Sequence, residues 1–378
     1  MKILVAPDSF KGSLTAAQFC EIAEKTANKV DKSIEIIKMP LADGGEGTTE
    51  AFVINTGGSL KYTYVKDPSG NTIKAFYGIL GDGKTAVIEM AQASGLPLVK
   101  KENRNPWNLT TYGTGEMIKD ALDNNISKII IGIGGSATND GGAGAMQALG
   151  FELLDGNGKD IVYGAEGLSE LKIIKTENHD RRIDFTEFII ACDVNNKLYG
   201  ENGASFVYGP QKGADRETVI KMDKAMINYS EMIKKYLGKD VSEIPGSGAA
   251  GGLGAGIMAF LNGKPESGFD IIKRELGLKN IFENNNIDLV ITGEGEINYQ
   301  SVNGKLPVEI SKLAKEYGVP SVVITGNMGR EYNKAYEKGV SAVFSITSGP
   351  MELEYAMKNT SALLENILEN ILRLYITK

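Results

Sequence analysis

The last third of the chain alternates strand and helix patterns, and this alternation constrains the fold more than any other feature. From Asp288 onward, apolar strand-like runs begin near residues 289, 319 and 342. Each run precedes a stretch of helical periodicity, at Pro307–Tyr317, Glu331–Lys338 and Glu352–Leu374. Units of this kind build a parallel sheet through right-handed crossovers.

Three strands make a thin sheet, but the N-terminus offers two more. Lys2–Ala6 and Ile34–Met39 have the same apolar strand pattern, and a helical pattern lies between them. The five strands predict a flavodoxin-like, doubly wound parallel sheet formed by residues 1–58 and 286–378. The first domain would then be discontinuous in the sequence.

The pattern changes at Ser59. From there to Met90 the apolar residues alternate with period two, and the turn signals DPSG and GDGK separate the runs. This pattern is typical of an antiparallel meander. We therefore expect residues 59–285 to form an inserted mixed α/β domain, with the active site in the cleft between the two domains. A chain of 378 residues is long enough for both.

Composition excludes several classes of protein. The net charge of −7 offers no basic surface for nucleic acid, and no apolar run reaches transmembrane length. Two cysteines, Cys20 and Cys192, argue against a disulfide framework. The single histidine, His179, lies in a polar run, which argues against a Ser-His-Asp or Cys-His mechanism. We expect a cytoplasmic enzyme, monomeric or homodimeric, with small-molecule partners and no membrane or nucleic-acid partner.

One segment in the middle of the chain, Lys128–Gly150, has the pattern of a ligand-binding loop. A buried strand over Ile129–Ile133 runs into a loop of glycines and small polar residues, and a short helical pattern follows. Backbone N–H groups of such a loop bind anions, and its hydroxyl and carboxylate groups suit phosphate or Mg²⁺. The alternative is an ordinary tight strand-to-helix connection. The candidate ligand residues are Gly134, Gly135, Ser136, Thr138, Asn139 and Asp140.

Two further loops follow the two N-terminal strands, where open α/β sheets place their sites. The first, PDSFKGS, contains Asp8, Ser9 and Lys11. The second, PLADGGEGT, contains the candidate substrate-binding residues Asp43, Gly44, Gly45 and Glu46. The alternatives are a solvated lysine in the first loop and an acidic helix-capping turn in the second.

Two nucleotide motifs occur in unsuitable contexts. Residues Gly78–Thr85 satisfy the P-loop pattern GxxxxGK[ST], but they lie on a hairpin turn that enters a strand, whereas a P-loop leaves a strand and enters a helix. We reject this match. Gly132, Gly134 and Ala137 fit the dinucleotide pattern GxGxxA, but the run Asn139–Gly142 interrupts the place of the helix.

Seven segments of the chain, in order, resemble the bacterial glycerate kinase family: APDSFKGSL, PLADGGEGT, IGIGGSATNDGG, ACDV, GPQKGA, GAAGGLGAG and ITGEG…Q…GK. The resemblance spans the whole chain. It implies ATP- and Mg²⁺-dependent phosphorylation of D-glycerate to 2- or 3-phosphoglycerate, and a flavodoxin-like domain with an inserted α/β domain. Asn298 stands where the family pattern has an acid, and Asn196-Lys197 where it has NP.

Phosphoryl transfer needs positioning, charge neutralisation and a base near the acceptor hydroxyl. No motif contains histidine, so we expect a carboxylate base, and Asp193 at the end of a strand is the candidate; a turn-capping role is its alternative. Lys11 and Lys305 would pair with the substrate carboxylate or the phosphates. Asp43, Glu46, Asp140 and Glu294 are the carboxylates available for Mg²⁺.

The predicted site therefore has four parts. They are Asp193 and Lys11 for catalysis; Asp8, Ser9, Asp43, Gly44, Gly45 and Glu46 for substrate; Gly134, Gly135, Ser136, Thr138, Asn139, Gly293, Glu294 and Lys305 for nucleotide; and Asp140 with Asp43 for metal. Two rival functions are an NAD-dependent oxidoreductase that uses the motif around Gly132, and a non-catalytic sugar-acid or nucleotide sensor.

Overall fold

The computed structural model describes residues 1–42, 44–299 and 301–377, which divide into two compact units. Unit 1 consists of Met1–Asp43, Glu50–Asn55 and Gly268–Lys378. Unit 2 consists of Gly44–Thr49 and Thr56–Ser267. Helix α2 (Thr48–Thr56) is shared between them.

Unit 1 is built on a five-stranded sheet of order β13-β12-β11-β1-β2 in which every neighbouring pair is parallel. This is the strand order of flavodoxin-like folds, and the predicted α/β class is confirmed. Its elements are β1 (Lys2–Val5), α1 (Ala16–Val30), β2 (Glu35–Lys38), α10 (Gly268–Glu275), α11 (Leu278–Asn284), β11 (Leu289–Ile297), α12 (Leu306–Glu316), β12 (Ser321–Met328), β13 (Ala342–Ser345), α13 (Leu353–Lys358) and α14 (Thr360–Ile376).

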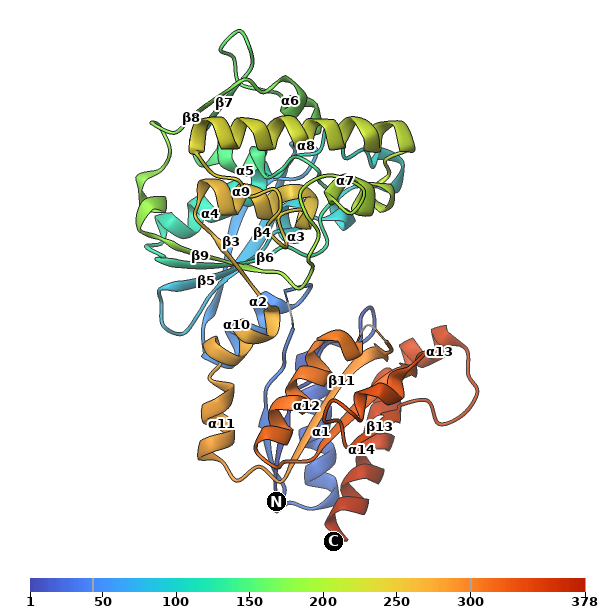
Figure 1. Ribbon diagram of the computed structural model, residues 1–378. Coiled ribbons are helices and arrows are strands. Elements are labelled where there is room, and N and C mark those ends of the chain that lie inside the picture. Colours follow the sequence, from blue (N-terminus) through green and yellow to red (C-terminus); the bar gives the residue numbers. More distant parts are fainter. Residues whose placement is uncertain (43, 300, 378) are drawn as a thin grey trace. The chain divides into compact units, whose positions relative to one another are not determined.

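Helices cover this sheet through two apolar clusters. Helices α1 and α14 lie side by side, and Phe19 and Leu364 join Ile3 and Ile291 of the strands in one buried cluster (Figure 1). Val308 of α12 belongs to a second cluster with strand residues. A capping box between Thr15 and Gln18 starts α1. The helices thus hold the sheet while the loops after its strands stay available for function.

Unit 2 contains a six-stranded mixed sheet of order β10-β9-β6-β5-β4-β3. Strands β3, β4 and β5 pair antiparallel, as the meander pattern predicted, whereas β5, β6, β9 and β10 pair parallel. Its elements are β3 (Ser59–Lys66), β4 (Thr72–Ile79), β5 (Thr85–Glu89), α3 (Ala91–Ser94), α4 (Tyr112–Asp123), β6 (Lys128–Gly132), α5 (Ala143–Ala148), β7 (Glu152–Leu154), α6 (Gly164–Glu170), β8 (Ile173–Lys175), β9 (Glu187–Ala191), α7 (Ala204–Tyr208), α8 (Arg216–Leu237), α9 (Leu253–Phe260) and β10 (Lys264–Glu266).

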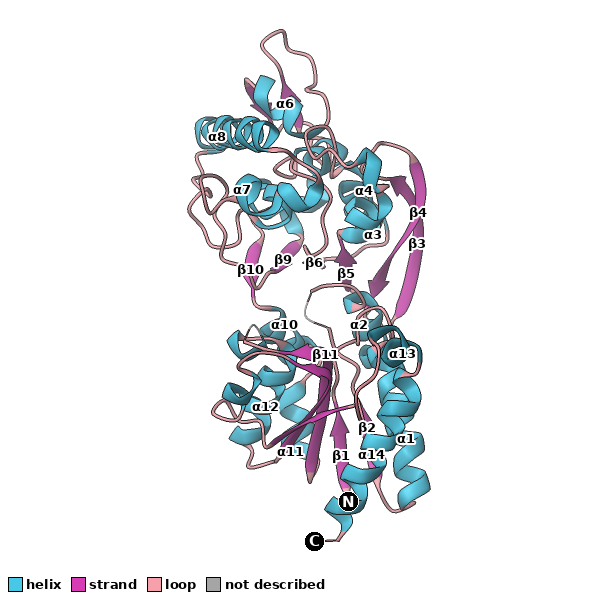
Figure 2. Ribbon diagram, turned by 90° about the vertical axis from the view of Figure 1, so that its right-hand side faces the viewer, coloured by secondary structure: helices cyan, strands magenta, loops and turns pink. Residues whose placement is uncertain are grey.

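Helices also pack against the sheet of unit 2. Helix α4 contacts β3, β4 and β5 (Figure 2). Helix α9 contacts β9 and β10. The longest helix, α8, packs against α6, α7 and α9. Strands β5, β6 and β9 are parallel to one another, so their carboxyl ends lie at the same edge of the sheet.

The bounds of the two units differ from the sequence expectation in two places. Helices α10 and α11 group with unit 1, although they lie within the predicted insertion 59–285. No change of pattern in the sequence separates them from the preceding segment. Gly44–Thr49 groups with unit 2 although it follows a strand of unit 1. Within the described ranges, none of the helices combines the length and apolarity that a membrane span requires.

Candidate active site

The segment Gly44–Thr49 lies against the carboxyl ends of the parallel strands of unit 2. A Cβ on Gly132, the last residue of β6, would lie 2.8 Å from the Gly44 carbonyl oxygen. A Cβ on Gly44 would lie 3.2 Å from the Cβ of Ala191, the last residue of β9. Only glycine permits this approach, and the φ of +95° at Gly44 favours glycine independently. The predicted substrate residues Gly44 and Gly45 are therefore at this sheet edge.

A buried carboxylate anchors the same segment. The backbone N–H of Thr49 donates to Oε1 of Glu89 at 2.8 Å, and Glu89 is the last residue of β5. Sequence reasoning missed Glu89; the signal was an acidic residue at the end of the otherwise apolar strand TAVIE. Glu46 is exposed, and Asp43 lies outside the described residues.

The central glycine loop after β6 has an exposed part and a buried part. Gly134 and Gly135 are exposed, whereas the residues from Ser136 to Asp140 are buried. The loop is fixed by the backbone of the segment after β5: Leu96 N–H donates to Gly135 O at 2.8 Å, and Ala137 N–H donates to Ser94 O at 2.9 Å. The loop is thus held by the segment after β5, and the backbone of Gly134 and Gly135 is accessible to a ligand.

Asp140 holds this loop together, and its geometry does not favour the predicted metal role. Oδ2 accepts hydrogen bonds from Thr111 N–H at 2.8 Å, from Thr111 Oγ1 at 2.8 Å and from Gly144 N–H at 3.3 Å. Oδ1 accepts from Gly142 N–H at 3.1 Å. The side chain is fully buried, and this burial raises its pKa, while the hydrogen bonds act in the opposite direction. We therefore assign Asp140 to loop structure in place of metal binding.

Two glycine-rich segments that are far from this loop in the sequence, one around residues 203–213 and one around 246–256, meet it. The side-chain amide of Asn139 donates to Ser205 Oγ at 3.0 Å, Lys212 Nζ donates to Thr138 O at 2.7 Å, and Gly141 N–H donates to Gly251 O at 2.9 Å. The motifs GPQKGA and GAAGGLGAG therefore form the back of the central loop. Lys212 lies in the first of these motifs, but sequence reasoning did not single it out.

Several buried polar atoms here have no hydrogen-bond partner among the described residues. They are Thr138 Oγ1, Asn139 Oδ1 and Tyr229 OH. All three residues are fully buried, and the Tyr229 ring lies directly behind Gly141. Thr138 and Asn139 belong to the loop, and Tyr229 packs against it from α8. Buried polar atoms are almost always paired, so we expect a ligand or water to pair with these three.

Asp193 lies in the chain segment that follows β9, at the same sheet edge. The preceding residue, Cys192, donates its backbone N–H to Glu266 O at 3.0 Å, and Asn196 O accepts from Gly248 N–H at 3.0 Å. The side chain of Asp193 is exposed. Asn196 accepts from Tyr208 OH at 2.6 Å and Lys197 pairs with Glu243, so the departure from the family's NP is accommodated by local contacts.

A second set of predicted residues gathers in unit 1 where the loop after β1 runs beside β11, and Gly293 and Glu294 lie within that strand and not in a loop after it. Asp8 N–H donates to Gly293 O at 2.9 Å, and Ser9 N–H donates to Asp8 Oδ1 at 2.6 Å. Lys305 Nζ lies 3.4 Å from Oε2 of Glu294, and the Glu294 residue is 5% exposed. Lys11 is exposed, in the turn after β1. Substrate and nucleotide candidates of this unit thus lie close together next to the end of β1.

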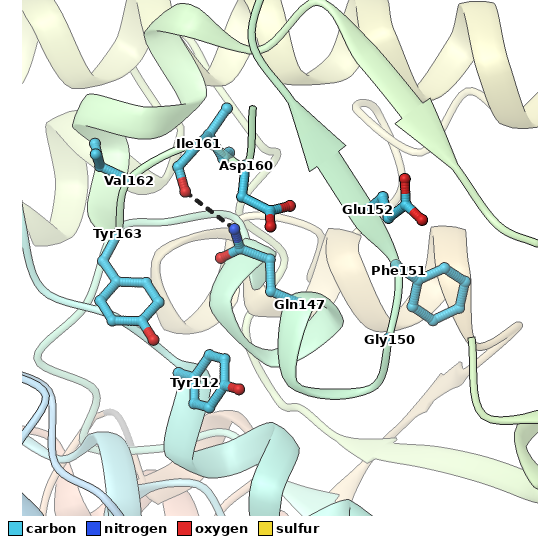
Figure 3. Close-up of a pocket in the computed structure, with 9 residues that line it drawn as sticks. All are labelled: Tyr112, Gln147, Gly150, Phe151, Glu152, Asp160, Ile161, Val162 and Tyr163. Atoms are coloured by element: carbon cyan, nitrogen blue, oxygen red, sulfur yellow. Dashed lines mark hydrogen bonds between the residues drawn. The ribbon is translucent and has the colours of Figure 1, made fainter. Parts of the chain in front are cut away.

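A cavity of about 630 Å³ in unit 2 is not part of the predicted site (Figure 3). Figure 3 shows Tyr112 and Tyr163 at one side and the carboxylates of Glu152 and Asp160 at another, with Gln147 donating to Ile161 O at 3.1 Å. None of the predicted site residues lines it. Its charged side chains are both acidic, which does not suit a polyphosphate.

The rejected P-loop match is a hairpin, as predicted. Strands β4 and β5 pair antiparallel on either side of the turn, and Lys84 N–H donates to Asp82 Oδ1 at 2.8 Å within it. No helix follows Lys84, because the chain enters β5. Gly83 of this motif, with a φ of +65°, therefore shapes a turn, and we expect no phosphate to bind there.

Lys84→Ala should leave the KM for ATP and kcat within about twofold of the wild type, whereas removing a true P-loop lysine would largely abolish turnover. Steady-state kinetics with varied ATP checks this. Lys305→Ala is the matched variant, because Lys305 is a lysine of the predicted nucleotide set. A large loss of turnover in a folded Lys84→Ala variant would contradict the assignment of Gly78–Thr85 to a turn.

The described carboxylates could bind a metal ion only if a bound substrate supplied the remaining ligands. Among the residues that the structure describes, no group of three or more His, Cys, Asp or Glu side chains could hold a metal ion. Mg²⁺ in phosphotransferases needs only one or two carboxylates in addition to substrate phosphates and water. Of the two predicted metal ligands, Asp140 has both oxygens engaged in hydrogen bonds, and Asp43 lies outside the described residues.

The glycine loops at the ends of parallel strands, with exposed lysines and carboxylates beside them, form the arrangement with which an α/β kinase binds a small phosphorylated ligand. Comparison with known proteins gives the family. The family model described as "Glycerate kinase family" matches residues 3–376, so the chain belongs to the glycerate kinase family. The predicted ATP-dependent glycerate kinase is thereby confirmed, and the oxidoreductase and sensor alternatives are not supported.

Individual relatives agree with the family model. The chain is 47% identical to a glycerate kinase of Halalkalibacterium halodurans, over 98% of this chain and 97% of the relative. It is 44% identical to the Glycerate 2-kinase of Escherichia coli, over 95% of this chain and 93% of the relative. A crystal structure from Salmonella typhimurium LT2 that bears the name glycerate kinase 2 matches with a TM-score of 0.89 and 42% identity, over 100% of this chain and 98% of that one.

Proposed function

We propose that this enzyme transfers the γ-phosphoryl group of ATP to the 2-hydroxyl of D-glycerate, with Mg²⁺, and that it works in the cytoplasm, where ATP is available. The reaction class follows from the family. The choice of the 2-hydroxyl is supported by the E. coli relative, whose name specifies a 2-kinase and which is 44% identical to this chain over 358 residues. The product would then be 2-phosphoglycerate.

The observation that carries this proposal is the convergence of two distant glycine-rich segments on residues 138–141 of the loop whose Gly134-Gly135 backbone is exposed. Ser205, Lys212 and Gly251 each bond to a different residue of the loop, so its backbone is fixed before a ligand arrives. Phosphoryl transfer is catalysed mainly by such positioning and by charge stabilisation. We assign the nucleotide phosphates to this loop.

The remaining residues divide between substrate and chemistry. We assign the acceptor hydroxyl to Asp193 as general base, because its carboxylate is exposed at the end of a strand beside the loop segment. Gly44, Gly45 and Glu46 lie at the same edge and suit the hydroxyl groups of glycerate. On unit 1, Lys11, Asp8, Ser9 and Lys305 offer the charges and donors that a glycerate carboxylate or a phosphate requires.

Mg²⁺ would be held by the nucleotide phosphates, with Asp43, which lies outside the described residues, as the candidate carboxylate ligand. When bound, it would neutralise part of the negative charge of the nucleotide phosphates. The residues of the chain hold the nucleotide, orient the hydroxyl and accept its proton.

The product identifies the reaction and its position. The purified protein is incubated with ATP, MgCl₂ and D-glycerate, and the proton-coupled ³¹P spectrum of the product is recorded. Phosphate on the 2-hydroxyl couples to one methine proton and gives a doublet, whereas phosphate on the 3-hydroxyl couples to two methylene protons and gives a triplet. A doublet supports the proposal, a triplet overturns the position, and absence of a phosphoglycerate signal overturns the function.

A further inference from the structure

Lys212 is the most deeply buried lysine near the proposed phosphate loop. It is 2% exposed and belongs to the short 3₁₀ turn Pro210–Lys212 between α7 and α8. Burial lowers its pKa to about 7, and the Asp140 carboxylate acts in the opposite direction. Lysines are almost never fully buried unless paired, because removing an ammonium group from water is costly. The contact made by Nζ of Lys212 must therefore compensate for the cost of burying this lysine.

That contact is a single backbone carbonyl of the proposed phosphate loop. Nζ donates to Thr138 O at 2.7 Å, across 74 residues of sequence. The same oxygen is confined from a second direction, since a Cβ on Gly251 would lie 2.0 Å from it. Two separate segments therefore fix the direction of one peptide group.

The direction of the Thr138 carbonyl group determines the direction of the Asn139 N–H, which could donate a hydrogen bond to a ligand. Peptide bonds in the part of the chain that the structure describes are trans, the one between Thr138 and Asn139 included. In a trans peptide the C=O and the N–H point in opposite directions. With Thr138 O directed at Lys212, the N–H of Asn139 is directed away from it. The buried Thr138 Oγ1 and Asn139 Oδ1, which lack partners among the described residues, belong to the same two residues.

We propose that Lys212 is a positioning residue for ATP: by holding the Thr138 carbonyl it orients the Thr138–Asn139 peptide so that the loop presents its donors to the nucleotide phosphates. This inference rests on the proposed assignment of the phosphates to this loop. Lys212 does not touch the substrate itself, so its loss affects nucleotide binding through the loop and leaves the glycerate residues in place.

Kinetics of Lys212→Met separate this role from a merely structural one. The variant keeps the apolar length of the side chain and loses the donor. We expect the KM for ATP to rise about 10- to 100-fold, the range for loss of one charge-assisted hydrogen bond, while the KM for glycerate stays within about twofold. Lys212→Arg, which restores a donor and a charge, should recover part of the ATP affinity.

Lys239→Met is the matched control. Lys239 is half-buried in the same unit and donates to the backbone carbonyl of Ala259, away from the glycine loop. Its loss should lower thermal stability without changing either KM. If Lys212→Met and Lys239→Met alter stability alone, or raise both KM values equally, Lys212 is structural and the proposal is overturned.

A measurement on the wild type decides the matter even if Lys212→Met does not fold. The dipeptide Thr-Asn occurs once in the sequence, at 138–139. Protein labelled with ¹³C at threonine carbonyls and ¹⁵N at asparagine therefore gives one carbonyl-filtered amide signal, from this peptide. We expect saturating ADP to shift it. An unmoved signal in an enzyme that turns over normally overturns this inference alone, whereas a wild type that neither binds ADP nor consumes ATP overturns the proposed function and this inference together.

Discussion

Asp193→Asn should lower kcat by about 10²- to 10⁴-fold, the contribution of a positioned general base. Asparagine keeps the shape and the hydrogen bonding of the side chain but cannot accept the proton of the glycerate hydroxyl. The KM for ATP should change little, because nucleotide binding does not depend on this proton. Initial rates with varied ATP and glycerate measure both quantities. Asp193 follows β9 and is exposed, so the substitution leaves no buried charge behind.

A Mg²⁺ titration of the same variant separates the other roles of Asp193. If Asp193 serves mainly as a metal ligand, high Mg²⁺ should restore part of the rate. If it only caps a turn, asparagine should replace it with normal kcat. Asp215→Asn is a suitable control, because Asp215 caps α8 by accepting from Thr218 N–H at 2.8 Å and lies outside the predicted site. A near-normal kcat for Asp193→Asn would remove this residue from the mechanism.

Asp140→Ala should destabilise unit 2 by roughly 3–5 kcal/mol, because several buried donors lose their only charged acceptor at once. The N–H groups of Thr111, Gly142 and Gly144 all donate to this carboxylate inside a fully buried environment. Nucleotide binding should be lost with the loop. Urea unfolding followed by tryptophan fluorescence reports on unit 2, since the one tryptophan, Trp107, lies in it.

Asp155→Ala is the matched control for this prediction. Asp155 also accepts backbone hydrogen bonds, from Asn157 at 2.8 Å and from Lys159 at 2.9 Å, but it lies in a solvent-accessible turn. Its loss should cost about 1 kcal/mol or less. If Asp140→Ala were no more destabilising than Asp155→Ala, and excess Mg²⁺ restored its activity, the metal role predicted from the sequence would replace the structural one.

The parts of the fold that depend on local patterns could be predicted from the sequence. Apolar periodicity located the five strands of unit 1, and the hairpin context of Lys84 excluded a P-loop. Two helices predicted from the sequence differ in the structure. The predicted helix Glu331–Lys338 is only a 3₁₀ turn, Tyr332–Ala335, preceded by Glu331 at a φ of +61°. The predicted helix Glu352–Leu374 is interrupted at Asn359, which leaves helical geometry with a φ of −108° and a ψ of 14°.

The site was harder to predict, because its contacts join distant segments. Each glycine-rich run was visible, but nothing local indicates that Ser205, Lys212 and Gly251 all meet the loop at 138–141. A lysine between glutamine and glycine has the pattern of a solvated turn, and its burial depends on tertiary packing. Asp140 has the sequence context of a metal ligand, yet its carboxylate is occupied by hydrogen bonds from the start of α4 and the start of α5.

Hydrogen–deuterium exchange with and without ATP tests most directly which glycine segment holds the phosphates. Mass spectrometry of peptides covering 134–142 and 80–85 compares the central loop with the P-loop-like turn in the same sample. The central loop should exchange more slowly when ATP and Mg²⁺ are added, and the turn at Lys84 should exchange at an unchanged rate. Protection of the 80–85 peptide with no change in 134–142 would contradict the assignment of the nucleotide to the central loop.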